Sequence, residues 1–119
     1  MANQSAKGFQ RLYNATLYSI KGFKATWKHE EAFRQEVLLF IIAVPLALLL
    51  GNNGIEHALL ITSIILILIV ELLNSAIESI VDRISLERHE LSGRAKDIAA
   101  AAVMLSVWNA IVVWALILI

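Results

Sequence analysis

Three long apolar segments follow one another along the chain. Residues 98–119 contain no charged residue and exceed the roughly 20 residues that a helix needs to cross the hydrocarbon core of a bilayer. Residues 55–73 are nearly as apolar, with polar residues confined to their ends. Residues 32–50 are long enough to cross when their polar first turns are included, and a bundle tolerates Pro45 when neighbouring helices satisfy the freed carbonyl. The pattern predicts three transmembrane helices.

A different pattern precedes these spans, over residues 1–29. This segment has no acidic residue, and its basic residues are Lys7, Arg11, Lys21, Lys24 and Lys28. Apolar side chains recur at helical spacing on a face that most of the basic residues avoid: Phe9, Leu12, Tyr13, Ile20, Phe23 and Trp27. A basic amphipathic helix of this kind lies on anionic lipid headgroups. The sequence predicts an interfacial surface helix, with a soluble helix packed on a partner domain as the alternative.

The composition agrees with a membrane protein. Of 119 residues, 59% are hydrophobic and 17% charged, whereas soluble domains are roughly 45–50% apolar and about 25% charged. This length allows a single domain over residues 1–119, and the composition excludes a disordered or collagen-like chain. Without cysteine, the chain has no thiol nucleophile, no disulfide and no cysteine-bound metal.

The ten basic and ten acidic residues balance in number but are unevenly placed. Basic residues concentrate in the amino-terminal helix and in a predicted loop over residues 82–97, and none lies in the turn at residues 51–54. By the positive-inside rule, the amino terminus and the loop face the cytoplasm, and the turn and the carboxyl terminus face out. The predicted fold is an all-α integral membrane bundle of three transmembrane helices with an amino-terminal amphipathic interfacial helix.

One face of the second span and its continuation is polar. Its members fall within an arc of roughly 80° at 100° per residue and form what we call the polar stripe: Glu71, Asn74, Ser75, Glu78 and Asp82. Ionisable side chains in a span are costly and normally face a bundle interior or a watered cavity, so a functional site is the leading hypothesis. Oxygen ligands of this kind could hold Mg²⁺. The alternative is a Glu71 that hydrogen-bonds between helices, with Glu78 and Asp82 merely solvated.

Other polar residues lie near the stripe. Three acids flank the start of the first span on the same side and could complete a cation site: Glu30, Glu31 and Glu36. Lys96 is placed to meet a phosphate, and Asp97 is expected to cap the third span. The three histidines lack metal-ligand spacing and are expected at the interface: His29, His57 and His89.

The motifs of soluble nucleotide-binding enzymes and hydrolases do not occur. The five glycines form neither G-x-x-x-x-G-K-[ST] nor G-x-G-x-x-G, and the sequence has no H-R-D, D-F-G or G-x-S-x-G. An acidic site beside basic residues nevertheless suits a metal-bound polyphosphate.

Three motifs carry a family resemblance. Residues 71–78 read E-L-L-N-S-A-I-E, residues 81–83 read V-D-R, and residues 89–97 read H-E-L-S-G-R-A-K-D. This core, with A-F-R-Q-E at residues 32–36 after Glu30, resembles the prokaryotic diacylglycerol kinase family over nearly the whole chain. Undecaprenol kinases share the core but read differently at A-F-R-Q-E and H-E-L-S-G-R, which favours diacylglycerol as the substrate.

The resemblance implies a homotrimeric enzyme of the bacterial inner membrane, with a cytoplasmic amino terminus and a periplasmic carboxyl terminus. Such enzymes transfer the γ-phosphate of ATP to the hydroxyl of diacylglycerol and give phosphatidic acid, with Mg²⁺ as cofactor. The implied partners are diacylglycerol, ATP, membrane lipid and further copies of the chain, with no nucleic acid.

The resemblance also implies roles for single residues. Glu71 corresponds to the general base, Asn74 would orient this face, and Glu30 and Glu78 correspond to the Mg²⁺ ligands. The implied nucleotide contacts are Arg11, Tyr18, Glu30, Glu78, Glu87, Arg88, His89, Lys96 and Asp97. The implied lipid contacts are Ser19, Lys24, Trp27, Ala32, Phe33, Arg34, Gln35, Glu36, Glu71 and Ala100. Three positions depart from the enterobacterial member, which has tyrosine, serine and arginine in place of Arg88, Ala100 and His57 respectively.

Two other classes of protein are alternatives. A small proton-coupled multidrug transporter also buries a glutamate in a short chain, but such transporters have four spans with the acid in the first. Here three spans are predicted and the acid is in the second. A non-catalytic membrane scaffold would use the polar stripe only to hold helices together.

Overall fold

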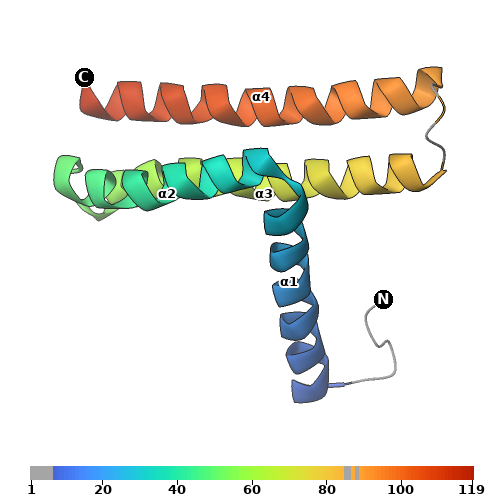
Figure 1. Cartoon of the computed structure of the whole chain (residues 1–119). Coiled ribbons are helices and arrows are strands. Elements are labelled where there is room, and N and C mark those ends of the chain that lie inside the picture. Colours follow the sequence, from blue (N-terminus) through green and yellow to red (C-terminus); the bar gives the residue numbers. More distant parts are fainter. Residues whose placement is uncertain (1–6, 85–86, 88) are drawn as a thin grey trace. The chain divides into compact units, whose positions relative to one another are not determined.

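The computed structural model describes residues 7–84, 87 and 89–119, and all regular structure within these residues is helical. The helices in chain order are α1 (Phe9–His29), α2 (Glu31–Leu50), α3 (Gly54–Ile84) and α4 (Glu90–Leu118), as Figure 1 shows. The chain divides into two compact units, with α1 in the first and the three apolar helices, from Ala32 onward, in the second. The predicted all-α class is confirmed.

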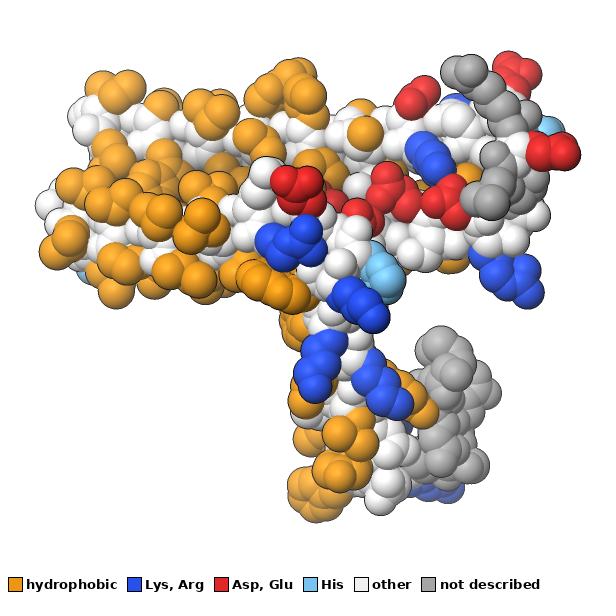
Figure 2. All heavy atoms as spheres, in the orientation of Figure 1, with side chains coloured by type: hydrophobic (Ala, Val, Ile, Leu, Met, Phe, Trp, Pro, Cys, Tyr) orange, Lys and Arg blue, Asp and Glu red, His pale blue; other side chains and the backbone are white. Residues whose placement is uncertain are grey.

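Helix α1 is the predicted amphipathic element. Residues 1–6 of the predicted segment lie outside the described part of the chain, and the helix begins at Phe9. Large apolar side chains such as Phe9 and Trp27 are exposed, and Figure 2 shows basic side chains along the same helix. The helix ends where Glu30 turns to an extended conformation, while its N–H still donates to the Thr26 carbonyl at 2.8 Å. The helix is confirmed, and its position on the membrane surface stays a prediction.

Three helices are long and apolar enough to cross a membrane, as the hydrophobic pattern predicts. Their ends differ from the predicted spans, because α3 continues from residue 73 to Ile84 and α4 begins at Glu90. Most of the predicted loop over residues 82–97 is therefore helical, and that loop prediction is wrong. Hydropathy marks the part of a helix that suits hydrocarbon, whereas a polar stripe on one face does not end the helix.

The cap of α4 also differs from the expectation. Asp97 lies inside the helix, so its predicted capping role is wrong. The N-cap is His89, whose Nδ1 accepts a hydrogen bond from the Leu91 N–H at 3.1 Å. This bond satisfies one of the backbone donors that the first turn of a helix leaves unpaired. A ring nitrogen serves the purpose for which Ser, Thr, Asp or Asn is the usual choice.

The turn between α2 and α3 is compact and reciprocally capped. The Asn53 side chain accepts from the Glu56 N–H at 2.9 Å, and the Glu56 carboxylate accepts from the Asn52 N–H at 3.0 Å. The His57 ring lies 3.0 Å from the Gly51 carbonyl oxygen. A Cβ at Gly51 would come within 2.9 Å of the Ala47 carbonyl oxygen as well as within 2.5 Å of the His57 ring, so this position favours glycine. The predicted turn at residues 51–54 is confirmed.

Small and branched side chains pack the bundle core. Ala43 of α2, Ile64 and Ile67 of α3 and Ala110 of α4 are buried together, with Phe40 packed against them. Ala110 lies where α4 runs close to α3, and a small side chain there lets the two backbones approach, which favours association in lipid. The core therefore lies among the apolar halves of the three helices.

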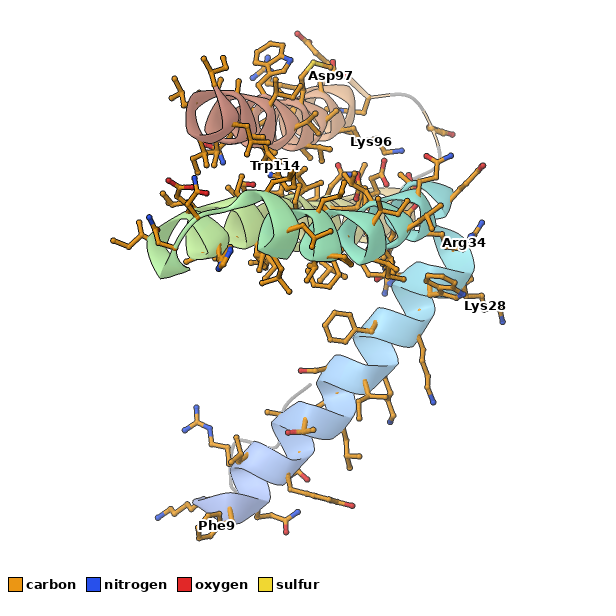
Figure 3. The ribbon with its side chains drawn as sticks, turned by 90° about the vertical axis from the view of Figure 1, so that its left-hand side faces the viewer. Phe9, Lys28, Arg34, Lys96, Asp97 and Trp114 are labelled. Carbon is orange, nitrogen blue, oxygen red and sulfur yellow. The ribbon has the colours of Figure 1, made fainter. Side chains whose placement is uncertain are left out.

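Trp114 ties α4 to α3 within this core. Its indole Nε1 donates to the Ser63 hydroxyl at 3.1 Å and to the Leu60 carbonyl at 3.2 Å, and Figure 3 shows the ring between the two helices. Replacing Trp114 by phenylalanine removes the donor and leaves Ser63 without it. We expect a loss of about 0.5–2 kcal/mol in unfolding free energy, measured by thermal unfolding in detergent. Trp108→Phe is the matched control on the exposed face of α4 and should change stability by less. Equal effects would contradict this role of Trp114.

Candidate active site

The polar stripe lies toward the end of the bundle where α3 ends and α4 begins. In Figure 2 acidic side chains gather at this end, and hydrophobic side chains cover the opposite half of the helices. Glu71 is 4% exposed, although it is ionisable and sits on a helix suited to hydrocarbon. Buried carboxyl groups are retained only when hydrogen-bonded or paired, which makes the neighbours of Glu71 the centre of interest.

Two side chains meet the Glu71 carboxyl group. Asn74, three residues further along α3, donates from Nδ2 to Glu71 Oε2 at 3.3 Å. The carboxyl group of Glu36, on α2, lies close enough to that of Glu71 for the two to interact electrostatically. Within the described residues, Glu36 Oε1 and Asn74 Oδ1 are buried and lack a partner. The centre therefore offers acceptor atoms for a donor such as a substrate hydroxyl.

A second charged contact joins α3 to α4 further along the stripe. Lys96 Nζ lies 2.7 Å from Asp82 Oδ1, and both side chains are about half exposed. Lys96 also lies in the electrostatic field of Glu78, which is one helical turn before Asp82. The structure thus brings a cation to the acidic stripe, as expected for Lys96, and pairs an acid that was expected to be solvated if the stripe had no function.

Asp97 lies on another side of α4. It lines an open pocket of about 560 Å³ with His89, Glu90, Gly93 and Arg94. Figure 3 shows Lys96 and Asp97 on different sides of the helix, as a 100° step between successive residues requires. Within one chain, the expected nucleotide contacts on α4 therefore divide between two surfaces.

The carboxylates of the polar stripe suit a divalent cation that is held partly by the protein and partly by the phosphates of a nucleotide. In the described part of the chain, no group of three or more His, Cys, Asp or Glu side chains is arranged to hold a metal. Mg²⁺ in phosphoryl-transfer sites, however, commonly uses one or two carboxylates together with substrate phosphates and water. Glu78, half-buried on the stripe, suits one such ligand. Glu30 belongs to the compact unit that contains α1, and its position is described within that unit only.

The other expected contacts lie on α1, at the start of α2 and on α4. On α1, Ser19 donates to the Ala15 carbonyl at 2.8 Å, and the Lys21 ammonium lies over the Tyr18 ring at 5.7 Å. The remaining α1 residues are Arg11, Lys24 and Trp27, which are exposed. On α2, Phe33 is buried, Arg34 is half-buried, and Ala32 and Gln35 are exposed. Ala100 is exposed on α4, Glu87 precedes that helix, and Arg88 lies outside the described residues.

Sequence reasoning did not find two of these relations. Glu36 was assigned to the cation or the lipid, and nothing in its spacing shows that α2 brings it to Glu71. Asp82 was recognised as a member of the stripe, but its partner lies on a separate helix. The only available signal was the i, i+4 spacing of Glu78 and Asp82, which predicts two carboxylates on one face.

The arrangement defines a class of protein: a small helical membrane protein with a buried carboxyl centre and a charged site at one end of its bundle. The sequence model of the family described as prokaryotic diacylglycerol kinase matches residues 17–118. The chain therefore belongs to the prokaryotic diacylglycerol kinase family. It is an enzyme of the ATP-dependent lipid kinase class.

Named relatives cover almost the whole chain. The diacylglycerol kinase of Escherichia coli strain K12 is 49% identical over 118 residues, which are 99% of this chain and 96% of the relative. That of Pseudomonas aeruginosa is 52% identical over 111 residues, 93% of this chain and 90% of the relative. The diacylglycerol kinase of Helicobacter pylori strain 26695 is 42% identical over 109 residues, which are 92% of this chain and 85% of the relative.

Proposed function

We propose that the protein transfers the γ-phosphate of ATP to the free hydroxyl of diacylglycerol and releases phosphatidic acid and ADP. The observation that carries this proposal is the buried Glu71 carboxyl group, held by Asn74 on a membrane-spanning helix. A buried acceptor at that depth can receive the proton of a hydroxyl whose acyl chains remain in lipid. The names of the relatives support diacylglycerol as the acceptor.

In the proposed reaction Glu71 is the general base. As the lipid oxygen forms its bond to the γ-phosphorus, the O–H bond breaks and the proton passes to the Glu71 carboxylate. The bond between the γ-phosphorus and the β–γ bridging oxygen breaks, and ADP leaves with its electron pair. Asn74 orients the carboxylate through its 3.3 Å hydrogen bond. Phosphoryl transfer depends mainly on positioning and charge neutralisation, so a soluble kinase fold is not required.

Glu30 and Glu78 would hold Mg²⁺, and Lys96 would add a second positive charge toward the phosphates. When bound, the cation neutralises charge on the polyphosphate and helps to align it. Arg11, Tyr18, the 87–89 segment and Asp97 complete the proposed nucleotide contacts. Acyl and headgroup contacts are proposed for Ser19, Lys24 and Trp27 of α1, residues 32–36 of α2, and Ala100 of α4.

The proposed setting is the bacterial inner membrane, with the amino terminus in the cytoplasm and the carboxyl terminus in the periplasm. The placement of basic residues supports this orientation. We propose a homotrimer, because a chain of three spans buries few side chains of its own and the family resemblance implies three copies.

The decisive experiment is phosphoryl transfer by the purified full chain in mixed micelles with Mg²⁺ and γ-labelled ATP. We expect the label to appear in phosphatidic acid when diacylglycerol is supplied. Preferential labelling of undecaprenol would identify the alternative lipid acceptor. If neither lipid is labelled, the kinase proposal is wrong, and proton-coupled drug uptake in liposomes would then support the transporter alternative.

A further inference from the structure

We propose that Asp82 is a positioning residue, which holds the Lys96 ammonium at the acidic face of α3 where the nucleotide phosphates arrive. The inference rests on the proposed function, because it assigns a role to Asp82 within that site. The contact that carries it is the 2.7 Å approach of Lys96 Nζ to Asp82 Oδ1, from one helix to the next.

Lysine needs such a partner in order to act at a defined place. Its side chain is flexible and its charge is a strongly hydrated point, so an exposed ammonium samples many positions. Asp82 is one turn after Glu78 on α3, and Lys96 is under the electrostatic influence of both carboxylates. The ion pair directs Lys96 toward the stripe and away from the side of α4 that carries Asp97.

The pair leaves Lys96 able to bind a phosphate. An ammonium has three N–H donors, and the single contact to Asp82 uses one of them. Both side chains are about half exposed, so a polyphosphate can reach the remaining donors. A second ion pair, between Arg94 and Glu90 at 3.7 Å, lies within α4 and does not fix one helix against another.

The test measures binding of a non-hydrolysable ATP analogue with Mg²⁺ to the full chain, without lipid. Asp82→Asn should weaken binding by about two- to fivefold, the range that an exposed ion pair supports. Glu90→Gln is the matched control, because it removes one negative charge from an ion pair near the same end and so reports the general effect of charge on anion binding. Asp82→Glu should restore part of the affinity. The proposal is overturned if Asp82→Asn binds the ATP analogue as tightly as Glu90→Gln does, or more tightly.

A double-mutant cycle separates positioning from a direct effect. In a Lys96→Met background, Asp82→Asn should no longer change the affinity for the analogue, because its effect passes through Lys96. A persistent loss in that background would overturn the role. Thermal unfolding of the same four proteins without nucleotide tests the ion pair alone, and additive effects there would also contradict the proposal. If the wild-type chain binds the analogue but phosphorylates no lipid, the proposed function fails while the cycle remains interpretable.

Discussion

Glu71→Gln is expected to lower kcat by about 10²- to 10⁴-fold, the contribution of a positioned general base. Glutamine keeps the shape of the side chain and can still meet Asn74 and Glu36, but its amide cannot take the hydroxyl proton. Because Glu71 is buried and lies two helical turns before the proposed metal ligand Glu78, affinity for the ATP analogue and the response to Mg²⁺ should change little. The measurement is initial rate at saturating ATP and diacylglycerol, with analogue binding measured separately.

Glu56→Gln is the matched control for this substitution. Glu56 lies at the opposite end of α3, where it accepts from the Asn52 N–H at 3.0 Å, and glutamine retains an acceptor oxygen for that bond. Its rate should stay close to that of the wild type. A near-normal rate for Glu71→Gln would assign the proton transfer to another group. Loss of analogue binding or of the folded state would show a structural role instead.

Hydropathy predicted the helices well because the bilayer imposes one dominant constraint. A spanning segment must satisfy its backbone polar groups internally, so about 20 apolar residues predict a helix with few alternatives. The helix ends were less predictable. Residues 82–84 and 90–97 are mostly polar, yet α3 and α4 continue through them.

The candidate site was predictable where a single helix carries it. The periodicity of α3 placed Asn74 on the face of Glu71, and the structure places the two side chains 3.3 Å apart. Contacts between helices could not be predicted in the same way. Which residue of α2 meets Glu71, and which side of α4 meets Asp82, depend on helix rotation and register, which one sequence without packing partners does not determine. His89 as a cap was missed because imidazole is an uncommon N-cap.

The second large effect concerns the proposed Mg²⁺ ligands. Glu78→Gln should raise the Mg²⁺ concentration needed for half-maximal rate by at least about tenfold, because loss of the groups that only support metal ligands already costs about ten- to a hundredfold. The physical reason is that Mg²⁺ prefers anionic oxygen ligands, and the amide oxygen of glutamine is neutral. Excess Mg²⁺ should therefore recover part of the Glu78→Gln activity, whereas it cannot recover Glu71→Gln, which lacks the base.

A direct metal readout keeps this prediction independent of turnover. Mn²⁺, added with the ATP analogue and followed by electron paramagnetic resonance, should bind more weakly to Glu78→Gln than to the wild type. Glu30→Gln should weaken it similarly if both carboxylates hold one cation, and Glu56→Gln should leave Mn²⁺ binding unchanged. Weaker Mn²⁺ binding in Glu78→Gln alone would remove Glu30 from the ligand set. Wild-type Mn²⁺ binding in both variants would mean that phosphates and water alone hold the cation, and that the acidic stripe serves to place Lys96.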